Sequence, residues 1–194
     1  MKAFFREIAI TAVLALVIFF VIKVTIGSFI VVGISMEPSF ENGQRLLANK
    51  VVYRLHEPER GDVVVFEPVD NKHVDYIKRI IALPGDTVEV KNGAVYVNGS
   101  KLNEPYINSS PAYTTKEQEI PANSYFVLGD NRNRSNDSHS GWVVPRQNIV
   151  GKAWISMWPP DKLGLVPSYP LEVQLVSSIS NYLTSMSYTY IYNR

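Results

Sequence analysis

The most pronounced hydrophobic segment of the chain lies at its amino terminus, where the residues from Phe4 to Ile22 are almost wholly apolar. Lys23 interrupts this run, and an apolar segment resumes from Val24 to Ile34. About 20 apolar residues allow a helix to cross a bilayer. The pattern therefore predicts a membrane-length helix, and we assign residues 1–27 to an N-terminal membrane anchor.

A cleaved targeting segment is the competing interpretation, because Lys2 and Arg6 resemble its basic start. No convincing small-x-small cleavage site follows the apolar run, so we expect a retained anchor. The positive charges of Lys2, Arg6 and the amino terminus on one side outweigh Lys23 on the other. This bias favours a single-pass membrane protein with a cytoplasmic N-terminus and its main domain on the extracytoplasmic side.

Beyond the anchor, short extended runs alternate with turn signals, which is typical of β-strands. Asn92-Gly93 is a strong hairpin signal, and Pro84-Gly85 is a pair typical of a type II turn. No helical stripe occurs between about residues 40 and 160, so residues 28–167 are predicted to form one mainly β domain. The predicted strands are 45–51, 62–66, 76–83 (the longest core strand), 88–90, 94–97, 125–128 and 149–155.

Residues 168–194 form a C-terminal extension rich in serine and tyrosine. Apolar residues recur at helical spacing between Leu171 and Leu183. Glu172 and Gln174 argue against a second membrane span. We interpret the extension as a peripheral helix or a loosely ordered tail.

Composition excludes several classes of function. The net charge of +1 gives no reason to expect a nucleic-acid partner. The absence of cysteine excludes disulfides, thiolate metal sites and a cysteine nucleophile. His56, His73 and His139 are too dispersed to indicate a zinc site. We therefore expect neither a metal nor a cofactor.

One predicted strand carries two cations among apolar residues. Side chains alternate along a strand, so Lys78 and Arg79 point to opposite faces. An unpaired buried charge is costly, and lysine can lose its proton whereas arginine in practice cannot. Neutral Lys78 could thus be a general base near neutral pH. Alternatively, its long side chain reaches the surface.

Ser35 follows the anchor, in the run Ser35-Met36-Glu37-Pro38-Ser39-Phe40. A serine becomes a nucleophile when a base removes its proton, and a Ser-Lys pair is a known alternative to Ser-His-Asp. Taken alone, a serine beside methionine and proline is more typical of an ordinary loop serine. A triad with His139 and either Asp137 or Asp130 is a second alternative.

A dense polar loop, from Gly129 to Trp142, is the third candidate segment. It is compatible with a solvated loop held by Asx turns. It is equally compatible with a loop folded into a site, where a hydroxyl orients the amine and carboxylates pair with arginines. The residues of these pairs would be Asp130 or Asp137 with Arg132 or Arg134.

Together these segments resemble the type I signal peptidase family, the membrane-bound Ser-Lys peptidases that remove signal peptides from exported proteins. The resemblance runs from about residue 1 to 166, and four boxes carry it in order after the anchor. Each box is weak alone, but the ordered set is highly specific. The boxes are Ser35-Met36-x-Pro38; Gly43-Gln44-Arg45-Leu46-Leu47-Ala48-Asn49-Lys50; Tyr76-Ile77-Lys78-Arg79 with Leu83-Pro84-Gly85-Asp86; and Gly129-Asp130-Asn131-Arg132 with Ser135 and Asp137-Ser138.

The resemblance implies that Ser35 is the nucleophile and Lys78 the general base. Arg79, which follows Lys78, is implied to be a supporting residue of the site. Ser135 matches the serine that holds the lysine amine, and Asp130 matches the structural aspartate of the site.

Two positions depart from the family pattern. Gly33 falls at the oxyanion position, where some members carry a serine hydroxyl, so the oxyanion would depend on backbone N–H groups, chiefly that of Ser35. Asp137 matches an aspartate that ordinarily pairs with a basic residue, and His139 stands where many members have Arg.

The implied fold is an antiparallel β-sheet catalytic domain with a small β insertion, here residues 87–122. The implied activity is that of a serine endopeptidase, a hydrolase that cleaves signal-peptide-bearing preproteins beside the lipid bilayer through an acyl-enzyme. An SOS-repressor-like autopeptidase shares the dyad but needs a DNA-binding helix-turn-helix, in place of which this chain has an anchor. A non-catalytic, membrane-anchored β module that binds exported proteins is the alternative from another class.

Overall fold

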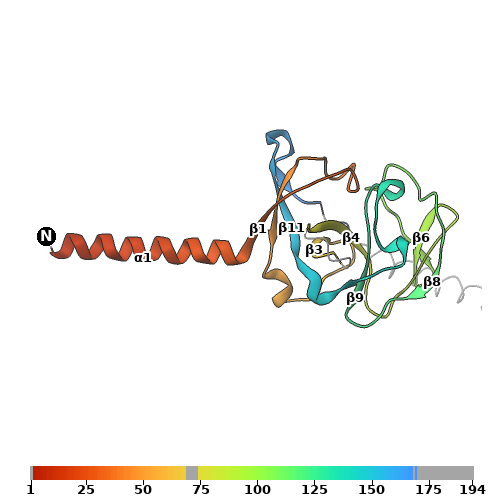
Figure 1. Ribbon diagram of the computed structural model, residues 1–194, viewed down its shortest axis with the longest axis horizontal. Helices are drawn as coiled ribbons and strands as arrows, with labels where there is room; N and C mark the ends of the chain where they lie inside the picture. The colour runs from red at the N-terminus through yellow and green to blue at the C-terminus, as the bar shows by residue number, and fades with distance from the viewer. Residues whose placement is uncertain (1, 69–73, 168, 170–194) are drawn as a thin grey trace, which may run out of the picture.

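The computed structural model describes residues 2–68, 74–167 and 169. Helix α1, Lys2–Thr25, projects from the β domain as an isolated rod (Figure 1). The segment Phe4–Thr25 is long and apolar enough to cross a membrane, and its most apolar window is not buried against the described protein. The predicted N-terminal helix is therefore confirmed.

The apolar sequence that resumes after Lys23 is not a continuous helix. The helix ends at Thr25, and Ile26–Ile30 form strand β1. Strand β1 pairs with β2, Arg45–Asn49, and Lys50 N–H donates a hydrogen bond of 2.8 Å to Thr25 O. These contacts attach the end of α1 directly to the edge of the main sheet.

The main sheet is antiparallel, with the strand order β1-β2-β11-β3-β4-β9-β10, and β12 pairs with β11. Strand β11, not 76–83 as predicted, is the longest in this sheet; it has register shifts along its pairing with both β2 and β3. Such irregularities bend a strand. The remaining strands are β3 Val63–Phe66, β4 Tyr76–Ala82, β9 Ser124–Leu128, β10 Val144–Pro145, β11 Ile149–Trp158 and β12 Gly164–Leu165.

A second sheet, with the order β7-β6-β5-β8, lies beside β9 (Figure 1). Its first hairpin turns at Asn92 and Gly93, with φ of 51° and 69°. Two successive residues with positive φ match the predicted Asn-Gly turn, because glycine and asparagine tolerate that conformation. The strands are β5 Thr87–Lys91, β6 Ala94–Val97, β7 Ser100–Lys101 and β8 Thr115–Glu119.

Between residues 40 and 160, where no helical stripe was expected, the described helices are all short 3-10 turns. They are η1 Val52–Arg54, η2 Arg132–Arg134, η3 Ser138–Ser140, η4 Arg146–Asn148 and η5 Pro160–Lys162. One hydrophobic cluster joins the two sheets, with Val88 and Val95 from the second sheet packed with Phe126 and Leu128 of β9. The segment from Leu171 onward, interpreted as a peripheral helix or a loosely ordered tail, lies outside the described residues.

Candidate active site

Strand β4 and the segment after β1 bring together two residues that are far apart in the sequence. Lys78 Nζ donates to Ser35 Oγ at 2.7 Å and to Ile77 O at 3.0 Å. Only 5% of Lys78 is exposed. The alternative in which Lys78 reaches the surface is therefore wrong. His139 does bond to Asp137, as a triad requires, but within the described residues Ser35 Oγ pairs with Lys78 rather than with His139, so the triad is not assembled.

Burial makes Lys78 a better proton acceptor at neutral pH. It lowers the pKa of the Lys78 amine from 10.5 to about 8, and the nearby carboxylates of Asp137 and Asp130 partly oppose this shift. At pH 7 the neutral fraction of such an amine is about 10%, compared with about 0.03% at the ordinary pKa. A neutral amine within 3 Å of a hydroxyl meets the geometric requirement for a general base.

The backbone around Ser35 is held from two sides. Asn131 donates from its backbone N–H to Ser35 O and from Nδ2 to Ile34 O, both at 3.0 Å. On the other side, Met36 and Phe40 are buried in the core. Asn131 had no assigned role in the sequence analysis, although it belongs to the last box, because a contact with residue 35 leaves no local signal.

Gly129 gives this loop its close approach to Ser35. A Cβ atom at position 129 would collide with the Ser35 carbonyl and the Ser135 side chain. Gly129 N–H donates to Asp137 Oδ2 at 2.8 Å, and Gly129 O accepts from Arg132 Nε at 3.0 Å. The polar loop is thus folded into the site rather than solvated.

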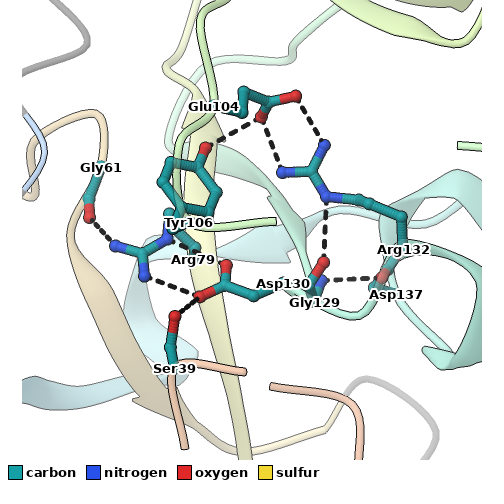
Figure 2. Close-up of polar contacts among 9 residues, drawn as sticks. All are labelled: Ser39, Gly61, Arg79, Glu104, Tyr106, Gly129, Asp130, Arg132 and Asp137. Atoms are coloured by element: carbon teal, nitrogen blue, oxygen red, sulfur yellow. Dashed lines mark hydrogen bonds and ion pairs between the residues drawn. The ribbon is translucent and has the colours of Figure 1, made fainter. Parts of the chain in front are cut away.

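Asp130 forms the most buried ion pair of the site, with Arg79 (Figure 2). Arg79 Nε and Nη2 donate to the two carboxylate oxygens at 2.9 and 2.7 Å, and Ser39 Oγ donates to Asp130 Oδ2 at 2.5 Å. Arg79 Nη1 donates to Gly61 O at 2.9 Å. Asp130 therefore pairs with Arg79, the residue after Lys78, and not with Arg132 or Arg134 of its own loop.

Arg132 pairs instead with Glu104, which the sequence did not single out (Figure 2). Arg132 Nη1 and Nη2 donate to the Glu104 carboxylate at 2.8 and 2.6 Å, and the Tyr106 hydroxyl donates to the same group at 2.8 Å. Glu104 follows β7 in the second sheet. The pair therefore links that sheet to the polar loop from Gly129 to Trp142, in which Arg134 is exposed.

Asp137 pairs with a basic residue, but with His139 rather than an arginine. Its carboxylate accepts from His139 Nδ1 at 2.7 Å and from His139 N–H at 3.2 Å. The hydrogen bond to Asp137 raises the pKa of His139. The imidazole also stacks on Tyr113, with 4.2 Å between ring centroids.

One expected contact is absent from the part of the chain that the structure describes. Ser135 Oγ is buried and has no hydrogen-bond partner, so Ser135 does not hold the Lys78 amine as the resemblance implied. Gly33, with φ of +90°, donates its N–H to Asn42 Oδ1 at 2.8 Å. That N–H is already engaged, so Gly33 does not present a free oxyanion donor.

A cavity of about 640 Å³ opens at Ser35 and Lys78. One wall comes from β1 and the residues after it, and another comes from the start of β4, so the cavity follows extended backbone on both sides. Its lining is mainly apolar, including Phe29, Val31 and Ile77. Within residues 2–68, 74–167 and 169, no group of three or more His, Asp or Glu side chains is arranged to hold a metal ion.

Comparisons with known proteins all match signal peptidases. The family described as signal peptidase, peptidase S26, matches residues 4–158. The chain is 49% identical over 137 residues to the probable signal peptidase I-2 of Synechocystis, covering 68% of this chain and 63% of that protein. It is 45% identical over 145 residues to signal peptidase I of Leptolyngbya laminosa, covering 70% and 71%. It is 38% identical over 170 residues to signal peptidase IB of Staphylococcus aureus, covering 76% and 88%. The chain therefore spans slightly less than two thirds of the Synechocystis relative.

Proposed function

The chain belongs to the signal peptidase family, peptidase S26, and we propose that it is a serine endopeptidase that removes N-terminal signal peptides from exported preproteins. The observation that carries this proposal is the buried amine of Lys78, 2.7 Å from Ser35 Oγ at the wall of an extended apolar cavity. A binding module without catalysis would gain nothing from a desolvated lysine paired with a serine.

The substrate lies extended in the cavity, beside the backbone of β1. Neutral Lys78 takes the proton of Ser35 Oγ as this oxygen attacks the scissile carbonyl carbon. The amine of the mature protein leaves with that proton, and an ester links the signal peptide to Ser35. Lys78 then takes a proton from water, the resulting hydroxide attacks the ester, and Ser35 recovers a proton as the carboxylate leaves. The Ser35 backbone N–H is the candidate donor to the oxyanion.

The other site residues support this pair by position. The pairing of Arg79 with Asp130 connects the strand of Lys78 to the loop that holds Ser35. Asp137 orders the same loop through Gly129 N–H. We assign no metal, cofactor or nucleic acid to the reaction.

The dyad is tested by cleavage of a preprotein with the detergent-solubilised full chain. We expect Ser35→Ala and Lys78→Ala each to lower kcat by about 10³ or more, and the double variant to be no slower, because residues that act as a unit give non-additive losses. Ser100→Ala and Lys101→Ala, a serine and a lysine on β7, are the matched controls. Full activity in either dyad variant would reject the assignment.

We also propose that residues 1–27 are a retained anchor in a lipid bilayer, with a cytoplasmic N-terminus. Residues 28–167 then form the extracytoplasmic peptidase domain, with 87–122 as its small insertion. The unburied apolar surface of α1 supports this arrangement. Protease added to the outer face of intact cells should digest the β domain and leave the N-terminal helix protected. A mature protein that begins near residue 28 would contradict it.

A further inference from the structure

Tyr169, in the C-terminal extension, packs against the ion pair that supports the dyad. The central carbon of the Arg79 guanidinium lies 4.2 Å from the ring centroid of Tyr106 and 5.1 Å from that of Tyr169. The two ring centroids are 4.9 Å apart. These three distances describe a nearly equilateral triangle, so the rings lie together on one side of Arg79 rather than on opposite faces.

This aromatic pair helps to keep Arg79 away from water. Arg79 is 1% exposed and Tyr106 is 3% exposed, whereas Tyr169 is only partly buried. Tyr169 therefore forms the outer layer of the stack. A cation over an aromatic face is attracted to the ring more strongly when it is desolvated.

Arg79 is connected to both of the reacting residues. It directly follows Lys78 on β4, and its partner Asp130 directly precedes Asn131, which holds the Ser35 carbonyl. A change in the Arg79–Asp130 geometry would therefore be transmitted to both the base and the nucleophile.

We propose that Tyr169 is a positioning residue for the peptidase reaction. Its ring closes the outer side of Arg79 and keeps water from the Arg79–Asp130 pair, because a pair that water reaches is held less firmly. Tyr169 does not touch the substrate. The inference rests on the proposed function and adds a role for a residue outside the matched family region, which ends at residue 158.

The test measures kcat and KM for one preprotein with the full chain and the variants Tyr169→Ala and Tyr169→Phe. We expect the Ala variant to lose about tenfold in kcat, with KM within about twofold. The Phe variant should retain wild-type kcat, since its ring face is unchanged. Tyr96→Ala is the matched control, because Tyr96 is also partly exposed and lies 4.9 Å from the Lys91 ammonium, but on the second sheet.

Salt dependence separates positioning from a loss of folded protein. In Tyr169→Ala the Arg79–Asp130 pair becomes accessible, so kcat per folded molecule should fall more steeply than in the wild type between low and high salt. If the Ala variant does not fold, Tyr169→Leu, which covers less of Arg79 and presents no ring face, should show a smaller loss in the same direction.

Wild-type kcat in the folded Ala or Leu variant would overturn the inference, and so would a loss explained wholly by the unfolded fraction. If the wild-type chain cleaves no preprotein, the proposed function fails instead. The two failures are therefore distinguishable.

Discussion

Replacing Lys78 with methionine should abolish cleavage and yet stabilise the protein at neutral pH. Burial lowers the pKa of Lys78 from 10.5 to about 8, so the folded state disfavours the charged amine. A shift of this size corresponds to about 3 kcal/mol. Methionine has a similar length and no charge. It cannot form the hydrogen bonds to Ser35 and Ile77, and their loss offsets about 1 kcal/mol of the stabilisation gained by removing the buried charge. We therefore expect a net gain of about 2 kcal/mol in the free energy of unfolding at pH 7.

The pH dependence of this gain has a definite sign. Below pH 8 the amine is charged in both states, and the wild type carries the full cost of burying it. Between about 8 and 10.5 the unfolded chain binds more protons than the folded chain, so wild-type stability rises with pH. The advantage of Lys78→Met should therefore shrink over this window and reverse before its upper end, where only the cost of the two lost hydrogen bonds remains.

Urea unfolding of the detergent-solubilised chain at several pH values from 7 to 10.5 measures both effects. Lys101→Met, at an exposed position on β7, is the control and should change stability little at any pH. A Lys78→Met variant that is less stable than wild type at pH 7 would refute the reasoning, as would a gain that does not vary with pH.

Two further substitutions test the loop around the dyad. His139→Arg should preserve or raise activity and extend it to higher pH. The hydrogen bond to Asp137 raises the pKa of His139, so the contribution of this ion pair is complete below about pH 6.5 and is lost as pH rises through the raised value, whereas arginine stays charged. Coincident pH–rate profiles would show that His139 does not have this role. Gly129→Ala should lower both activity and stability, the latter by about 1–3 kcal/mol, because the new methyl group meets the Ser35 carbonyl. Gly164→Ala, at an open position, is its control in thermal unfolding and cleavage assays, and equal behaviour of the two variants would contradict the steric argument.

The sequence alone determined the features that depend on neighbouring residues. An apolar run of membrane length predicted α1, and Asn92-Gly93 predicted a hairpin because its two residues tolerate positive φ. Short apolar runs bounded by turn signals located most strands of the main sheet. The apolar strand around Lys78 marked that lysine as a candidate base on physical grounds, whereas its pairing with Ser35 came from the ordered boxes and the resemblance to a family.

Tertiary structure decided which of these groups meet and which become buried. Lys78 is desolvated because β3 and β9 flank its strand, and whether it lay inside or outside could not be read from β4 alone. Asp130 had two arginines near it in sequence, but its partner is Arg79 on another strand. Local patterns predict an element because its interactions span a few residues. Ion pairs and pKa values depend on which strands become neighbours. That strand pairing forms only when the whole sheet folds and packs on its core.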